Sequence, residues 1–282
     1  MTAKMHSFTF DDNNDKKLEI QSHTGVFTIR RSEGNNVDIK IDGTDAQIEN
    51  YDIKKEGSSI IISQKSNTFT NGVSIGNGVF IANGVVIGNG ACIGGIVTNS
   101  FNTSYSSYSG SNGRYFNSVV NGVYYDHNGN PQSQPQQIIE KPISFEITLP
   151  YDMHFNLDLS GQAKIISNIT YKTLELDLSG ASKAEFIGGG NSNVDLSGAT
   201  KGGINDIIGS FTCSCSGSSS ITSSGEFSFL KLKSSGASKI NTRGTCSGDY
   251  NAKASGASSI KHSGVINGRV TKNKSGAASI KI

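Results

Sequence analysis

The chain has no tryptophan, only four prolines and four cysteines, and no long apolar run. None of its segments approaches the roughly 18 apolar residues that a transmembrane helix needs, so we expect no membrane span. Cys92, Cys213, Cys215 and Cys246 form no CxxC pair, and four thiols in 282 residues do not make a disulfide scaffold. We expect them to be small buried side chains.

Helical and export signals are also missing. Apolar residues at i, i+3, i+4 and i+7 are nowhere sustained, which indicates an all-β chain. No apolar run of signal-peptide length follows Met1, and residues 11–15 are Asp-Asp-Asn-Asn-Asp. Together with the unpaired cysteines, this favours the cytoplasm or an unconventional secretion route.

Signatures of the common enzyme classes are absent from the sequence as well. It contains no HExxH motif, nucleophile elbow or phosphate-binding loop, and the lone run Gly188-Gly189-Gly190 is typical of a corner. The five histidines lie in distinct segments, at His6, His23, His127, His154 and His262. The sequence therefore predicts no cofactor, and a protein that is not an enzyme.

Glycine, by contrast, is abundant. The chain has 34 glycines, about 12% of its residues against an average near 7%, and no Gly-X-Y period that would indicate collagen. Seven of these glycines follow a serine at spacings of 18 to 20 residues. They are Gly161, Gly180, Gly198, Gly217, Gly236, Gly256 and Gly276.

The residues around each Ser-Gly pair repeat too. Ahead of each pair, apolar or small residues alternate with polar ones, which is typical of a strand with one buried face. An isoleucine often follows four residues after the glycine, as at Ile165 and Ile240. The two alternating positions hold Leu157, Leu176, Val194, Cys213, Leu232 and Ala252, and then Leu159, Leu178, Leu196, Cys215, Ser234 and Ala254.

These patterns predict an all-β fold, a single-stranded β-solenoid of about 19-residue Ser-Gly-Ala-Ser coils. One such unit cannot bury its apolar side alone, whereas stacked copies can. Glycine suits the corners because it permits positive φ. The register predicts that Gly236 lies at a tight turn between Gly217 and Gly256.

Apolar alternation also occurs upstream, in residues 17–64 and 143–149. We therefore predict N-terminal strands and first coils over residues 1–65, an insertion over residues 66–136, and a solenoid of seven repeats over residues 137–282.

The expected insertion has a different composition. Residues 67–136 contain 12 Asn, 12 Gly and 9 Ser, and only Arg114 and Asp126 are charged. Residues 71–94 form four six-residue repeats such as Asn-Gly-Val-Val-Ile-Gly, which resemble the hexapeptide of left-handed β-helices. They suit short strands broken by Asn-Gly turns, and an ordered β patch and a mobile loop both stay open. Residues 99–136 are predicted to be a flexible surface loop.

The repeat also resembles a known family. Ser-Gly-Ala-Ser-Lys-Ile at residues 235–240 and Leu-Ser-Gly-Ala-Ser-Lys-Ala at residues 178–184 are similar to the head GIN domain of auto-transporter adhesins. The resemblance covers residues 1–65 and 137–282, including the Leu149-Pro150 pair before the first Ser-Gly. It implies one β-solenoid domain interrupted by an insertion, and a bacterial adhesin on the cell surface, although the sequence shows no export signal.

Asp158, Asp177 and Asp195 form the first candidate site. On stacked coils they would lie about 4.8 Å apart, and each neighbouring pair would repel by about 1 kcal/mol in water. We expect partial compensation by lysines six residues further on, at Lys164, Lys183 and Lys201. The alternatives at these carboxylates are a Ca²⁺ site and a catalytic role.

A basic C-terminal segment is the second candidate. Residues 232–282 hold nine Lys and Arg against Asp249 alone, so they carry +8 while the other 231 residues carry −6. The segment is either a solubilising edge that prevents end-to-end stacking or a surface for polyanions such as acidic glycans, lipid head groups or nucleic acid. The candidate polyanion-binding residues are Lys233, Arg243, Lys253, Lys261, Arg269, Lys272 and Lys274.

The sequence therefore predicts a non-catalytic, adhesin-like or structural binding module, with a glycan or a cell-surface protein as partner. Only Tyr250 interleaves with the C-terminal charges, so there is no strong nucleic-acid signature. The alternative is a carbohydrate-active β-helix enzyme that uses the aspartate column.

Overall fold

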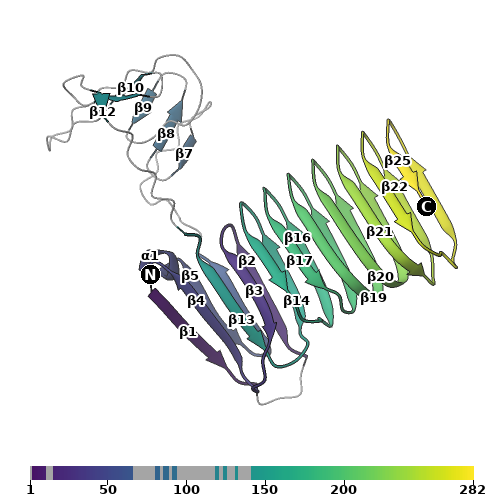
Figure 1. Ribbon diagram of the computed structural model, residues 1–282, viewed down its shortest axis with the longest axis horizontal. Helices are drawn as coiled ribbons and strands as arrows, with labels where there is room; N and C mark the ends of the chain where they lie inside the picture. Colours follow the sequence, from purple (N-terminus) through teal and green to yellow (C-terminus); the bar gives the residue numbers. More distant parts are fainter. Residues whose placement is uncertain are drawn as a thin grey trace. The chain divides into compact units, whose positions relative to one another are not determined.

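The computed structural model describes residues 2–10, 15–65 and 141–282, and the backbone of six short strands between residues 80 and 132. The chain falls into two compact units, one made of Met1–Lys65 and Lys141–Ile282 and the other of Ser66–Glu140. The first unit is a β-solenoid of stacked parallel coils, as the repeat predicts (Figure 1).

Nineteen strands of this unit are hydrogen-bonded into one continuous sheet that wraps around the core. We call its two broad sides face 1 and face 2. Face 1 runs, in pairing order, through β5 (Tyr51–Glu56), β6 (Ser59–Gln64), β2 (Lys17–Ser22), β14 (His154–Leu159), β16 (Thr173–Leu178), β18 (Asn191–Leu196), the second halves of β19 (Lys201–Cys215) and β20 (Ser220–Ser234), β22 (Tyr250–Ala254) and β24 (Val270–Lys274).

Face 2 begins with the first strand of the chain. It runs through β1 (Thr2–Phe8), β4 (Val37–Gly43), β13 (Ser144–Leu149), β3 (Val26–Arg31), β15 (Lys164–Ser167), β17 (Lys183–Ile187), the first halves of β19 and β20, β21 (Lys239–Cys246), β23 (Ser259–Ser263) and β25 (Ser279–Lys281). β19 and β20 are 15 residues long because they bend from face 2 to face 1, with register shifts after Ile204 and Gly209.

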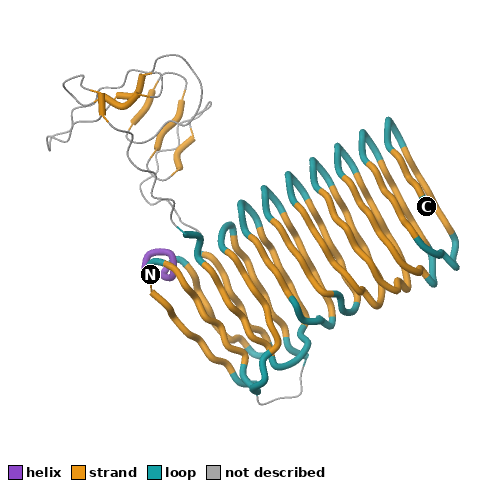
Figure 2. Tube along the Cα trace, in the orientation of Figure 1, coloured by secondary structure: helices purple, strands orange, loops and turns teal. Residues whose placement is uncertain are grey.

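The Ser-Gly corners lie in a row along one edge of the solenoid (Figure 2). Gly236 has a φ of +69°, and a Cβ added there would lie 2.8 Å from the carbonyl oxygen of Gly217. That carbonyl accepts a hydrogen bond from the Ala237 N–H at 2.8 Å. A Cβ at Gly256 would in turn lie 3.0 Å from the Gly236 oxygen. The predicted place of Gly236 is confirmed.

Buried hydroxyls close these corners from the inside. The Ser238 hydroxyl donates to the carbonyls of Ser235 at 2.7 Å and Cys215 at 3.0 Å. The Ser182 hydroxyl lies in the same way against the carbonyls of Ser179 and Leu159. The last serine of Ser-Gly-Ala-Ser therefore links its own corner to the preceding coil, since each hydroxyl contacts one carbonyl of each.

The core lies between the two faces and is built from the alternating positions. All twelve residues predicted to face inward are buried, from Leu157 to Ala252 and from Leu159 to Ala254. The described cysteines Cys213, Cys215 and Cys246 are buried and free, as expected. Cys92 lies outside the described side chains.

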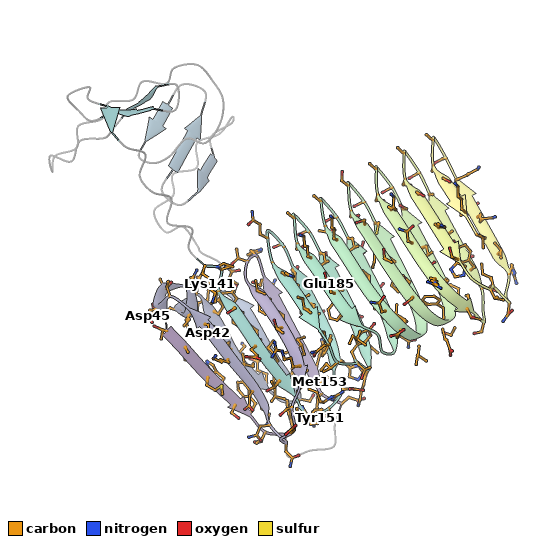
Figure 3. The ribbon with its side chains drawn as sticks, viewed as in Figure 1. Asp42, Asp45, Lys141, Tyr151, Met153 and Glu185 are labelled. Carbon is orange, nitrogen blue, oxygen red and sulfur yellow. The ribbon has the colours of Figure 1, made fainter. Side chains whose placement is uncertain are left out.

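The N-terminal end of the solenoid contains three antiparallel strand pairs. β1 pairs antiparallel with β4, β4 with β13, and β5 with β6. Lys141 lies at one end of these strands, whereas Tyr151 and Met153 lie at the other (Figure 3).

A short helix, α1 (Asp45–Glu49), joins β4 to β5, and its Thr44–Gln47 capping box is the sequence signal that predicts such a helix start.

No helix in the described part of the chain has the length and apolar character to cross a membrane.

The second unit contains two small antiparallel sheets. β7 (Phe80–Ala82), β8 (Val85–Gly88) and β9 (Ala91–Ile93) lie in the second to fourth hexapeptides. Their antiparallel pairing differs from a left-handed β-helix, in which successive coils stack in parallel. β10 (Ser118–Val120), β11 (Val123–Tyr125) and β12 (Pro131–Gln132) lie where we expected a loop. The first hexapeptide lies outside the described residues.

Candidate functional site

The aspartate column stands on the outside of face 1. Asp177 lies opposite Asp158 on one side and Asp195 on the other, in exact strand register, and all three are exposed. Partial burial and the two neighbouring carboxylates raise the pKa of Asp177. The same column continues through Ser214 to Lys233 and Lys253, so it changes from acidic to basic along the solenoid.

The expected compensation by lysines is not found. Lys164, Lys183 and Lys201 do form a register column, but they stand on the outside of face 2. The Ser-Gly corner between each aspartate and its lysine carries the chain from one face to the other. No ion pair in the described ranges joins the two columns, because their side chains leave the solenoid on opposite sides.

The aspartate column is also the candidate Ca²⁺ site. Among the residues that the structure describes, no group of three or more His, Cys, Asp or Glu side chains is arranged to hold a metal ion. The aspartate column is an exposed row of carboxylates, and a Ca²⁺ site there stays a hypothesis.

The seven basic candidates do not form one patch. Lys233 and Lys253 are neighbours on face 1, and Arg243 and Lys261 lie on face 2. The main-chain N–H of Arg269 donates to Asp249 Oδ1 at 3.0 Å. The last two candidates, Lys272 and Lys274, lie in β24 of the terminal coil.

The terminal coil places two lysines at positions that are apolar or small in earlier coils. Lys272 lies opposite Ala252 and Lys274 opposite Ala254, both of which face the core. All five residues of β24 are nevertheless exposed, and Val270 is 43% exposed. Charged side chains at inward positions of an edge strand oppose pairing with another chain.

A groove of about 510 Å³ lies beside Lys233 and Lys253 on face 1. Lys274 joins these two lysines in its lining, and no carboxylate lines it. Four serines of the Ser-Gly pairs line it as a column, Ser216, Ser235, Ser255 and Ser275. None of their hydroxyls has a hydrogen-bond partner within the described part of the chain. We call this the C-terminal groove.

A second groove, of about 710 Å³, lies at the opposite end of the corner row. Its lining includes Lys164, Lys183 and Gln162 from the first coils, Asn50 at the end of α1 and Gln64 at the end of β6. We call it the N-terminal groove. Sequence reasoning missed it, although Gln162 replaces the small residue that follows the Ser-Gly pair in the other six repeats.

Several solved structures are similar to this chain. A putative lipid binding protein from Parabacteroides distasonis matches with 13% identity and a TM-score of 0.52, over 99% of this chain and 96% of that one. This likeness shows a shared fold.

Two putative adhesins also match, each at 10% identity. The one from Parabacteroides distasonis has a TM-score of 0.44 over 100% of this chain and 97% of that one. The one from Parabacteroides merdae has a TM-score of 0.41 over 99% and 96%. No family model and no curated protein matches the chain. The resemblance to the GIN domain therefore stays a prediction, whereas the fold is one that a solved structure shares.

Proposed function

We propose that this chain is a non-catalytic, adhesin-like binding module that holds a linear anionic polysaccharide in the C-terminal groove. One observation carries the proposal. Three lysines and a column of four serines with unpartnered hydroxyls line the same groove, and no carboxylate lies among them. Cations without a neighbouring anion create the positive potential that attracts a polyanion.

Strand register sets the spacing of the charges. Lys233 and Lys253 occupy equivalent positions on adjacent strands, which lie about 4.8 Å apart. A polymer that repeats an anionic group along its length can meet both lysines at once. The serine column beside them supplies hydroxyls that donate to sulfate or carboxylate oxygens and accept from sugar hydroxyls.

The position of the aspartate column supports a binding module over a catalytic one. Glycoside hydrolysis needs two carboxyl groups that flank a bound sugar, and the three aspartates line neither groove. The raised pKa of Asp177 is the one observation that favours the alternative, a carbohydrate-active enzyme with this carboxyl group as proton donor. If Asp177→Asn abolished a measurable glycan cleavage, the enzyme would be the correct interpretation.

Affinity for heparin, measured by calorimetry at two salt concentrations, tests the main proposal. The double variant Lys233→Gln/Lys253→Gln should bind at least about tenfold more weakly, since two charge-assisted contacts are lost. Lys239→Gln/Lys261→Gln makes the same charge change on face 2 and should leave affinity nearly intact. Equal losses for the two pairs would mean that only the net charge of the chain matters.

The adhesin-like assignment also predicts exposure at the cell surface, as the family resemblance implies. Fractionation of the native host with an antibody against the solenoid measures it. Recovery of the protein only in the cytoplasmic fraction would contradict a role in adhesion while leaving the polysaccharide site itself open to the calorimetric test.

A further inference from the structure

We propose that the N-terminal groove is a second, separate binding site, for an acidic oligosaccharide. The groove lies where the corners of the first three repeats meet α1 and the ends of β5 and β6. Its volume of about 710 Å³ falls within the roughly 300–1,000 Å³ of ligand sites. It shares no lining residue with the C-terminal groove, so the two proposals can fail separately.

The wall of the groove is held in place before any ligand arrives. The Tyr51 hydroxyl donates to the Thr24 carbonyl at 2.8 Å and lies 2.7 Å from the Ser22 hydroxyl. Gln64 Oε1 accepts from the His23 N–H at 2.8 Å. Groups that are already ordered lose little entropy when a ligand binds, which favours affinity.

Several polar groups of the lining are left for a ligand. Gln64 Oε1 is occupied, while its Nε2 has no acceptor in the described part of the chain. The side-chain amides of Asn50 and Gln162 also have no partner among the described residues. Side-chain amides both donate and accept, as sugar hydroxyls do.

The N-terminal groove also offers positive charge and apolar surface to an acidic sugar. Lys164 and Lys183 both line the groove, and neither forms an ion pair within the described ranges. A lysine attracts a carboxylate such as that of a uronic acid. Ala181, Ala199 and Pro142 supply small apolar surfaces, against which the C–H side of a sugar ring can pack. An acidic sugar uses all three kinds of surface.

The repeat itself singles out Gln162. The other six coils carry a small residue at this position, namely Ala181, Ala199, Ser218, Ala237, Ala257 and Ala277. The corner is otherwise the same, with Gly161 at a φ of +60° and the Gln162 N–H bonded to the His23 carbonyl at 3.1 Å. The fold therefore does not need a glutamine there, and the long amide occurs in the coil that faces the groove wall.

Register also provides a matched control. Lys183 and Lys201 are neighbours in the lysine column of face 2, but only Lys183 lines the groove. Replacing either lysine changes the charge of the chain equally.

The test is calorimetry on the whole chain with tetragalacturonate and, for comparison, its methyl ester. Wild type should bind the acid and not the ester. Gln162→Ala and Lys183→Gln should each weaken binding about tenfold, because each removes a contact to the ligand. Lys201→Gln and Lys233→Gln/Lys253→Gln should bind within about twofold of wild type, as expected for residues outside the groove.

Six other corners already carry alanine or serine at the position of Gln162. Gln162→Ala should therefore fold and keep the melting temperature of wild type. Undetectable binding to wild type, equal affinity for the ester, or equal losses for Lys183→Gln and Lys201→Gln would overturn the proposal. Since none of these outcomes involves heparin, they leave the proposed function at the C-terminal groove untouched.

Discussion

An alanine at Gly236 should destabilise the solenoid far more than an alanine at Gly57, although both glycines have a left-handed backbone. Gly236 has a φ of +69° and Gly57 a φ of +57°. A Cβ at Gly57 would meet nothing within 4 Å, whereas a Cβ at Gly236 would lie 2.8 Å from the Gly217 carbonyl oxygen. The pair therefore separates backbone strain from the steric effect of the stack.

The expected magnitudes follow from these contacts. Gly57→Ala carries only the strain of the left-handed conformation, about 1–2 kcal/mol. Gly236→Ala carries the same strain and must also displace a backbone oxygen, for which overpacking costs a further 1–3 kcal/mol or so. The Gly217 oxygen also accepts the Ala237 N–H, and weakening that bond adds about 1 kcal/mol. We expect about 3–6 kcal/mol in total.

Gly276→Ala provides an intermediate case. Its φ is +66°, but an added Cβ would lie 3.2 Å from the Gly256 oxygen, in a terminal coil that has room to move. Urea unfolding followed by circular dichroism should rank the midpoints Gly57→Ala, Gly276→Ala, Gly236→Ala from highest to lowest, provided that the slopes agree. Equal midpoints for the Gly57 and Gly236 variants would show that the corners do not stack as described.

Two further predictions concern charge. Lys272→Val/Lys274→Val would give the last coil an apolar edge and should produce end-to-end association in light scattering, whereas a monodisperse variant would contradict the protective role of these lysines. The pKa of Asp177 is raised in the fold, so its ionisation lowers the free energy of unfolding as pH rises above the ordinary aspartate range. Asp177→Asn should therefore raise the urea midpoint near neutral pH but not in acid, and the same shift at both would refute the carboxylate repulsion.

The register of the coils could be predicted because it depends on short-range sequence patterns. Positive φ at the Ser-Gly glycine demands glycine in every coil, as at Gly161 and Gly276. The alternation before each pair decides which side chains are buried, as at Leu176 and Leu178. Both signals span only a few residues, so they can be recognised in the sequence without knowledge of the rest of the fold.

The contact between the aspartate and lysine columns is a feature that the local sequence pattern predicted wrongly. The sequence places Lys183 six residues after Asp177, and this spacing alone predicted a pair. The intervening corner sends the two side chains to opposite faces, so the aspartates repel without compensation. A separation along the chain does not reveal on which side of a corner a residue emerges.

Glycine spacing and apolar alternation by themselves determined the solenoid, its buried positions and the close approach at Gly236, because each coil contacts only its neighbours and repeats the same local rules. Only the tertiary structure decided which polar residues share a groove. Asn50, Gln64 and Gln162 are far apart in the chain and meet in the N-terminal groove because the antiparallel N-terminal strands close that end of the stack. Such contacts depend on how the end of the solenoid is completed, which no repeat specifies.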